Sequence, residues 1–428
     1  MKKSLLTLLC IAAAFTVKAQ EQNALESIKS PDGRMEVTFN LAGTEKPTYS
    51  VKYDGKPMLE DSPIGIMLDM GSKPTLEGLP QGREAANGDF TKNLTVSSVK
   101  TTTAKAEYEL ATIKQAKVSH EYVQCVFTLA NQARQEIEFE FRISNNDIAI
   151  RYNIPKPRQR ASTRVLFENT GFRFPDGTTT FLTPQSDAMI GWQRSKPSYE
   201  EGYSNDGPMN VRSQYGHGYT FPGLFHVGSN GWVLLSETGV SSSYCGSRLG
   251  DCKDNTYKIE FPMPDENNGI GTVCPALRLP GSTPWRTITV GADLKPIVET
   301  TVMWDYVEPL FEAHHDFKYG RSTWSWIVWQ DASCNWDDQV KFIDLASAMG
   351  YEYILIDAGW DQNIGYERME QLISTSTAKC TASSSPMPSG SARRSSRCPS
   401  TTTPASSAPR STARSSALPR FRASSSTA

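Results

Sequence analysis

The chain has 428 residues, which is enough for roughly two or three domains, each with its own hydrophobic core. Its 44 basic and 46 acidic residues give a net charge of −2, which excludes the strongly basic surface that binds nucleic acids or anionic membranes. With 38% hydrophobic and 21% charged residues, it is not collagen-like, a coiled coil or a polytopic membrane protein.

The N-terminus has the pattern of a secretory signal peptide. Lys2 and Lys3 precede a short apolar run over residues 4–17, and small residues flank a cleavage position near Ala19 or Gln20. A buried N-terminal helix is the alternative. We predict that residues 1–20 are removed, that the mature protein is periplasmic or secreted, and that it is not inserted in a membrane, because no later apolar run is long enough to span one.

Residues 21–295 read as short strands separated by turn residues. Apolar and polar residues alternate in each candidate strand, as they do in a half-buried sheet, and Asp54-Gly55 is a hairpin turn signal. The candidate strands are residues 35–41, 49–53, 135–141, 148–152, 233–235 and 286–290. This pattern predicts an antiparallel β-sandwich of two packed sheets, followed by a linker over residues 296–318.

Residues 319–373 have the order strand, helix, strand, helix. The apolar run Ser322–Trp329 predicts a buried strand, and a helical pattern runs from Asp337 to Gly350. Its apolar face is Val340, Ile343, Ala346 and Met349. The run Tyr353–Ile356 predicts a second strand, and residues 364–373 begin another helix. This order is typical of an α/β domain with parallel strands.

Residues 374–428 have a different composition. Serine, threonine, alanine, arginine and proline fill 48 of the 55 positions, with 8 basic residues and no aspartate or glutamate. Such a segment cannot bury enough apolar surface to offset its ordering entropy. It is either a native disordered tail or, as we favour, an out-of-frame reading of coding DNA.

Candidate sugar-binding residues lie near the second parallel strand. Asp357 and Trp360 directly follow residues 353–356, and in parallel α/β barrels the active site lies at the C-terminal strand ends. A carboxylate accepts sugar hydroxyls and an aromatic ring packs against the C–H face. The alternatives are that Asp357 only orders the turn and that the nearby tryptophans are core residues.

Two further features of the sequence are ambiguous. Glu200 lies in the sandwich region and is either a solvated loop acid or a ligand for a hard cation. Cys245 and Cys252 flank a short turn and either form a disulfide or remain thiols, which their spacing does not decide.

The order of the motifs resembles glycoside hydrolase family 97, the exported α-glucosidases and α-galactosidases of Gram-negative bacteria. The resemblance covers residues 21 to about 373 and rests on five segments taken together. These are residues 30–34, 197–200, 283–288, 320–326 and 353–360. It implies an N-terminal super-sandwich, a central (β/α)₈ barrel with bound calcium, and a small C-terminal β domain, so that residues 319–373 would be the first two βα units of the barrel.

The resemblance also assigns functions. It implies an exo-acting α-glycosidase that removes terminal glucose or galactose from oligosaccharides, with calcium as cofactor. By the same resemblance Glu200 is a calcium ligand, while Trp324, Asp357 and Trp360 line the sugar subsite. The form Asp-Ala-Gly-Trp at residues 357–360 is more similar to the retaining members.

The acidic residues depart from the family pattern. A glycosidase needs two carboxylates that flank the scissile bond. In the family they come from later barrel strands, after the position of residue 373, where this chain has no acidic residue. We therefore assign no catalytic residue and expect the chain by itself to be inactive. The alternatives are a non-catalytic carbohydrate-binding sandwich and a structural surface protein.

Overall fold

The computed structural model describes residues 15–17, 26–70, 88–110, 115–157, 160–188, 201–269, 273–308, 310 and 319–383. The chain divides into two compact units, Met1–Leu310 and Phe311–Ala428, and each is described by itself. Within the described ranges, no helix is long and apolar enough to cross a membrane.

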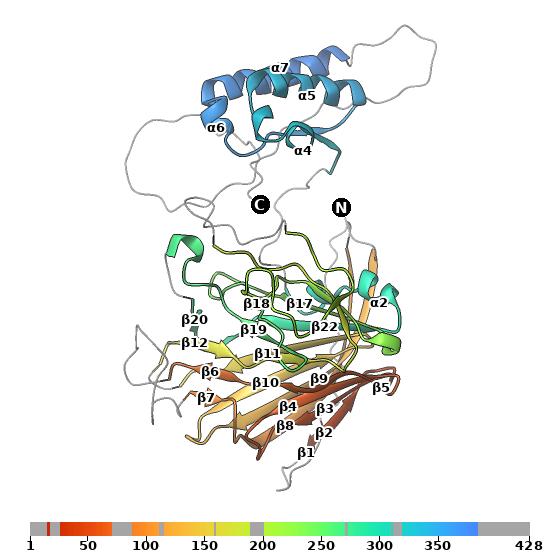
Figure 1. Ribbon diagram of the computed structural model, residues 1–428, viewed down its shortest axis with the longest axis vertical. Coiled ribbons are helices and arrows are strands. Elements are labelled where there is room, and N and C mark those ends of the chain that lie inside the picture. The colour runs from red at the N-terminus through yellow and green to blue at the C-terminus, as the bar shows by residue number, and fades with distance from the viewer. Residues whose placement is uncertain are drawn as a thin grey trace. The chain divides into compact units, whose positions relative to one another are not determined.

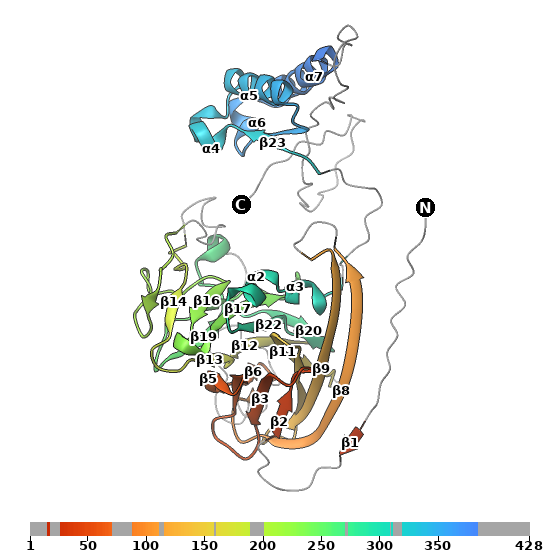
Figure 2. The same ribbon diagram turned by 90° about the vertical axis from the view of Figure 1, so that its right-hand side faces the viewer.

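An 11-stranded antiparallel sheet dominates the first unit in the described residues (Figure 1). In spatial order its strands are β1 (Phe15–Val17), β8 (Thr95–Glu109), β9 (Lys117–Ala130), β10 (Glu136–Ile143), β11 (Asp147–Ile154), β22 (Trp285–Gly291), β17 (Trp232–Thr238), β16 (Gly223–His226), β14 (Thr179–Phe181) and β15 (Gly207–Pro208), with β21 (Gly281–Ser282) beside β11. The hairpin of β8 and β9 forms a long curved ribbon (Figure 2). Strand β1 lies inside the expected signal peptide, which stays a prediction.

Three smaller antiparallel sheets complete the first unit as described. One contains β2 (Glu26–Lys29), β3 (Met35–Asn40), β4 (Thr48–Tyr53) and β5 (Lys56–Pro63); the second β20 (Ala276–Arg278), β12 (Ser162–Glu168), β6 (Ile66–Leu68) and β7 (Asp89–Phe90); the third β13 (Gly171–Arg173), β19 (Thr256–Glu260) and β18 (Arg248–Leu249). Short 3₁₀ turns are η2 (Gly228–Asn230) and η3 (Glu266–Gly269).

Aromatic side chains join the sheets in one core. Phe39 of β3 packs against Phe127 of β9 and Phe141 of β10, with ring centroids 4.9 and 4.6 Å apart. All three side chains are buried, and the same core extends through the smaller sheets. The predicted antiparallel β architecture is therefore confirmed, because alternating residues of each strand point into this shared interior.

The predicted strands and the hairpin turn are also found. Each of the six predicted strand segments falls on β3, β4, β10, β11, β17 or β22. In the β4–β5 hairpin Tyr53 pairs with Lys56, so Asp54 and Gly55 are the two turn residues. Their φ angles of 50° and 76° are those of the turn that matches the natural twist of a hairpin.

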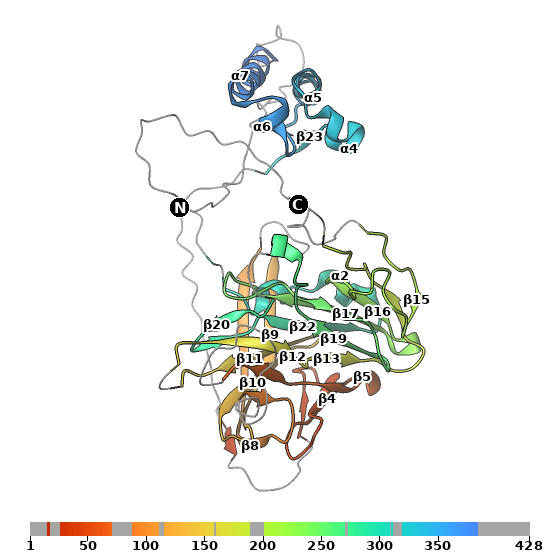
Figure 3. The same ribbon diagram turned by 60° about the vertical axis from the view of Figure 1, so that its left-hand side comes forward.

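The first unit extends beyond residue 295, where a linker was expected. Two short helices, α2 (Leu294–Glu299) and α3 (Val302–Asp305), follow β22, and α2 lies against β22 and β17 (Figure 3). Val302 and Tyr306 are buried against Trp285 and Ala149 in a small hydrophobic cluster. These apolar contacts make the beginning of the expected linker part of the sandwich unit.

The second unit contains a parallel two-stranded sheet in its described part. Strand β23 (Ser322–Trp324) pairs in parallel with β24 (Tyr353–Leu355), and helix α5 (Trp336–Met349) connects them. Helix α7 (Tyr366–Ser383) lies beside α5 (Figure 3) and shares a hydrophobic core with β24. The shorter elements are α4 (Trp326–Trp329), η4 (Asp331–Ser333) and α6 (Trp360–Asn363). The predicted order of strand, helix, strand and helix is found, and the complete barrel stays a prediction.

Two details of the predictions for this unit were wrong, the length of the first strand and the burial of Met349. The strand expected over Ser322–Trp329 ends at Trp324, because Ser325 adopts a helical conformation and the following residues form α4. Helix α5 has the expected Gly350 terminus, in the left-handed conformation. Of its predicted apolar face, Ile343 and Ala346 are buried and Val340 packs against the same core, but Met349 is 54% exposed. Gln339 and Phe342 are buried as well.

Helix α7 continues past the change in composition at residue 374. Its backbone is helical as far as Ser383, which differs from the disorder expected for that segment. Alanine and lysine are good helix formers, and the preceding turns are anchored by the buried Met369 and Leu372. Residues 384–428 lie outside the described residues.

Candidate functional site

The C-terminal ends of the parallel strands bring two of the predicted sugar-binding residues together. Trp324 is the last residue of β23, and Asp357 follows β24 by two positions. The indole Nε1 of Trp324 donates a hydrogen bond of 3.0 Å to Oδ2 of Asp357. Parallel pairing places both strand ends at one edge, which explains how residues 33 positions apart meet there.

Asp357 also orders the turn that follows it. Its Oδ1 accepts a hydrogen bond of 2.8 Å from the backbone N–H of Ala358. Gly359 then has a φ of 84°, a conformation that suits glycine, and α6 begins at Trp360. The turn-ordering alternative is thus part of what Asp357 does, and its role toward sugar hydroxyls stays a proposal.

Trp360 makes a different contact. Its half-buried ring packs edge-on against Tyr366 at the start of α7, with centroids 5.1 Å apart. The structure therefore joins Trp324 to Asp357 directly and places Trp360 three residues further along the same turn. A sugar-binding role for the three residues stays a proposal.

Sequence reasoning missed a buried polar cluster beneath this edge. Ser325, Ser333 and Gln339 are each no more than 2% exposed. Gln339 Nε2 donates to Ser325 Oγ and to the Ser333 carbonyl, both at 2.8 Å, and Ser333 Oγ donates to Ser325 Oγ at 2.9 Å. Part of the signal was available, because Gln339 lies four residues before Ile343 and seven before Ala346, which were both placed on the apolar face of the predicted helix.

The structure leaves the calcium prediction open. Glu200 lies outside the described residues; its neighbour Glu201 accepts a hydrogen bond of 2.9 Å from the Tyr215 hydroxyl. No group of three or more histidine, cysteine, aspartate or glutamate side chains that could hold a metal occurs among the described residues. Calcium binding therefore stays a prediction.

Cys245 and Cys252 are not joined by a disulfide. Burial raises the pKa of the Cys245 thiol to about 12 and also raises the pKa of Cys252. Both side chains therefore remain protonated, unreactive thiols at neutral pH.

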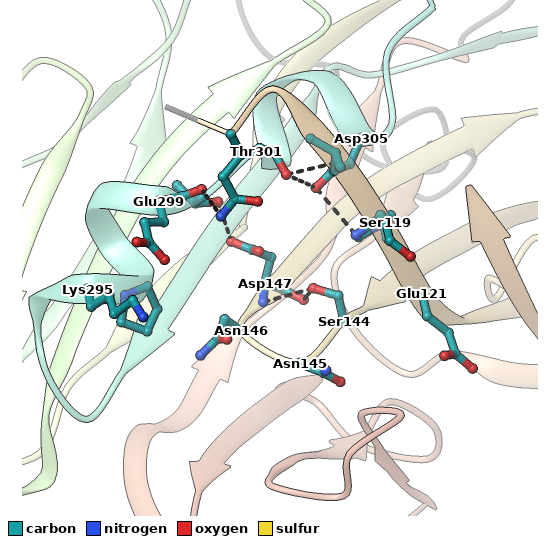
Figure 4. A pocket seen from close by; sticks show the side chains of 15 residues that line it. Ser119, Glu121, Ser144, Asn145, Asn146, Asp147, Lys295, Glu299, Thr301 and Asp305 are labelled. Carbon is teal, nitrogen blue, oxygen red and sulfur yellow. Dashed lines mark hydrogen bonds and ion pairs between the residues drawn. The ribbon is translucent and has the colours of Figure 1, made fainter. Parts of the chain in front are cut away.

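A polar pocket of about 350 Å³ opens in the first unit, between β9, the β10–β11 turn and helices α2 and α3 (Figure 4). At its base the Asp147 carboxylate accepts hydrogen bonds from Thr289 (2.6 Å) and Thr300 (2.8 Å). Burial raises the pKa of Asp147 to about 6, from an ordinary value of 3.8. The buried His120 lies 3.4 Å from Asp305, and burial lowers its pKa.

The raised pKa of Asp147 predicts a specific dependence of stability on pH. Because the folded pKa lies above the unfolded one, Asp147 favours folding at low pH, and this contribution is lost as pH rises through about 6. Asp147→Asn should remove a pH-dependent difference of about 2–3 kcal/mol between pH 4 and pH 7.5. His120 titrates in the opposite direction, so urea unfolding of variant and unmodified chain must be compared at each pH. Parallel stability curves for the two chains would contradict the assignment.

Comparison with known proteins identifies the family. Residues 28–309 match the family model described as Glycosyl-hydrolase 97 N-terminal. The antiparallel sandwich of the first unit is thus the N-terminal domain of a sugar-hydrolase family. The chain belongs to glycoside hydrolase family 97, as its motifs predicted.

Individual relatives extend the comparison. A β-arabinopyranosidase of known crystal structure has 52% sequence identity to this chain. The match covers 83% of this chain and 54% of the β-arabinopyranosidase, with a TM-score of 0.75. A probable retaining α-galactosidase of Streptomyces bingchenggensis is 24% identical over 351 residues, covering 81% of this chain and 48% of that protein. A retaining α-galactosidase of Bacteroides thetaiotaomicron is 22% identical over 395 residues, which cover 86% of this chain and 55% of that protein. The chain spans about half the length of these curated relatives.

Proposed function

We propose that the chain belongs to an exported, exo-acting glycosidase that removes a terminal galactose-like sugar from oligosaccharides. The observation that carries this proposal is the 52% identity, over 83% of the chain, to a β-arabinopyranosidase. The two retaining α-galactosidases support the same reaction class. Export to the periplasm or the medium is supported by the predicted N-terminal signal peptide.

Stereochemistry reconciles the two activities of the relatives. A β-L-arabinopyranoside has the ring configuration of an α-D-galactopyranoside, with hydrogen in place of the hydroxymethyl group. Glucose differs from both in the orientation of the hydroxyl at C4. Of the two sugars expected from the sequence, galactose is therefore favoured over glucose, because a site that hydrogen-bonds one hydroxyl geometry rejects the other.

The 428-residue chain by itself is proposed to bind sugar without cleaving it. Retaining and inverting glycosidases both need a pair of carboxylates on opposite sides of the bond. Residues 374–428, which stand where the resemblance puts those carboxylates, contain none. The same observation favours the second candidate function, a non-catalytic carbohydrate-binding protein.

Calcium is proposed as the cofactor of the complete enzyme. Glu200 would supply one or two oxygen ligands where calcium takes about six to eight. The 428-residue chain should therefore bind calcium weakly.

A hybrid enzyme tests the function. Residues 1–373 are joined to the segment that follows the equivalent position in the β-arabinopyranosidase, which restores an acidic second half. The hybrid should release p-nitrophenol from the β-L-arabinopyranoside or the α-galactoside at least about tenfold faster than from the α-glucoside. Preference for the glucoside would refute the proposed substrate class.

A further inference from the structure

The edge of the parallel sheet carries a second indole–carboxylate pair beside the predicted one. The Trp326 Nε1 donates a hydrogen bond of 2.7 Å to Oδ1 of Asp331, as Trp324 donates to Asp357. The rings of Trp324 and Trp326 are stacked, with centroids 5.6 Å apart and planes inclined by 20°. Two copies of the same chemical unit therefore lie next to each other.

These pairs can offer a ligand only two kinds of contact. An indole has one hydrogen-bond donor, and both donors are already used by the carboxylates. The half-buried rings can therefore contact a ligand only through their apolar faces and edges. A carboxylate has about four acceptor positions, and the Trp326 indole occupies one of those on Asp331. Apolar rings flanked by acceptors suit a pyranose, which has C–H faces and a rim of hydroxyl donors.

The loop that carries the second pair is held rigidly from below. Ser325 lies between the two tryptophans, and the buried cluster with Ser333 and Gln339 fixes it against α5. The carbonyl of Gln330 lies 2.7 Å from Ser333 Oγ and is a second acceptor for the same hydroxyl hydrogen. Because this loop is already ordered in the folded chain, it loses little conformational entropy when a ligand binds, which favours affinity.

We propose that Trp326 and Asp331 form a subsite for the second sugar ring of an oligosaccharide, next to the terminal ring at Trp324 and Asp357. This inference rests on the proposed function. The two indoles are stacked next to each other, and each has a carboxylate hydrogen-bonded to its Nε1, so two linked sugar rings can each contact one indole–carboxylate pair. The second subsite recognises the sugar on the leaving-group side of the scissile bond.

A binding experiment on the full 428-residue chain separates the two subsites. Galactose and the disaccharide melibiose are titrated and followed by saturation-transfer NMR. Trp326→Ala should weaken melibiose binding by about tenfold and change galactose binding by less than about twofold. Trp324→Ala should weaken both. Trp329→Ala is the matched control, because Trp329 lies on the same short helix but packs edge-on against Phe342, with centroids 5.0 Å apart.

The outcomes distinguish this inference from the proposed function. Unchanged melibiose binding by Trp326→Ala, or equal weakening of both sugars, overturns the second subsite alone. If the unmodified chain binds neither sugar, both the second subsite and the proposed site for the terminal sugar are refuted. Near-UV circular dichroism of each variant shows whether a loss of binding comes from unfolding; if Trp326→Ala unfolds, Trp326→Leu and Asp331→Asn give the same comparison.

Discussion

The 428-residue chain is expected to release no p-nitrophenol from α-galactoside, α-glucoside or β-L-arabinopyranoside substrates, with or without calcium, whereas the hybrid enzyme should hydrolyse at least one. The described strand ends bring together Trp324 and Asp357, the residues that we propose to hold a sugar. The carboxylates of Asp357 and Asp331 are hydrogen-bonded to Trp324 and Trp326, and residues 374–428, where the resemblance places the opposed pair that lowers the barrier to glycoside cleavage, contain no acidic residue. Glycosidic bonds are very stable in water, so binding without that pair gives no measurable turnover.

A substitution in the hybrid then tests the sugar-binding role of Asp357. Asp357→Ala should lower kcat/KM by about tenfold or more, because it removes a hydroxyl acceptor and releases the Trp324 indole. Asp361→Ala is the control, since Asp361 is an exposed residue of the adjacent helix α6. Turnover by the unmodified 428-residue chain above a heat-treated sample would show that carboxylates within residues 21–373 form a complete site.

The strands of the first unit could be predicted from sequence because their periodicity is a local property. A half-buried strand alternates between core and solvent, so residues 35–41 and 148–152 show their strand character directly. The pairing of β11 with β22 joins residues far apart in the chain, and no local pattern encodes it. The buried position of Tyr306 was missed for the same reason, since its partner Trp285 is on another element.

The candidate site was predictable only in part. Asp357 could be found because it directly follows a buried parallel strand, where function concentrates in this class of fold. Trp326 was read as part of a strand, because a run of apolar residues does not distinguish a strand from a short helix. Its hydrogen bond to Asp331 depends on the turn at Ser325, which the residue types alone do not specify.

Removal of Glu168 should destabilise the first unit more than any surface substitution. Arg286 of β22 is completely buried, and its guanidinium donates to both carboxylate oxygens of Glu168, at 2.6 and 3.1 Å. It also donates to Glu237 of β17, and Tyr244 donates to Glu168 at 2.6 Å. The network thereby ties the large sheet to β12 of a smaller sheet.

The charge balance of this network explains the expected size of the effect. Burial alone would lower the pKa of Arg286, but attraction to Glu168 and the hydrogen bonds between them raise it, so the guanidinium stays charged. Without Glu168, a buried cation would depend on Glu237 alone. Removing one partner of a buried ion pair typically lowers the free energy of unfolding by about 3–5 kcal/mol, because the remaining buried charge has neither its partner nor hydrating water.

Urea unfolding of the full chain, followed by circular dichroism, measures this effect. Glu168→Ala should lower the free energy of unfolding by about 3–5 kcal/mol, and Glu168→Gln by less, because the amide oxygen still accepts one guanidinium hydrogen bond. Glu107→Gln is the matched control: it breaks an ion pair of 2.8 Å with Lys105 whose side chains are 67% and 55% exposed, and it should leave the unfolding midpoint unchanged. If Glu168→Ala unfolds at the same urea concentration as that control, Glu237 must compensate Arg286 by itself, and the sheets are held together by the aromatic core rather than by this ion pair.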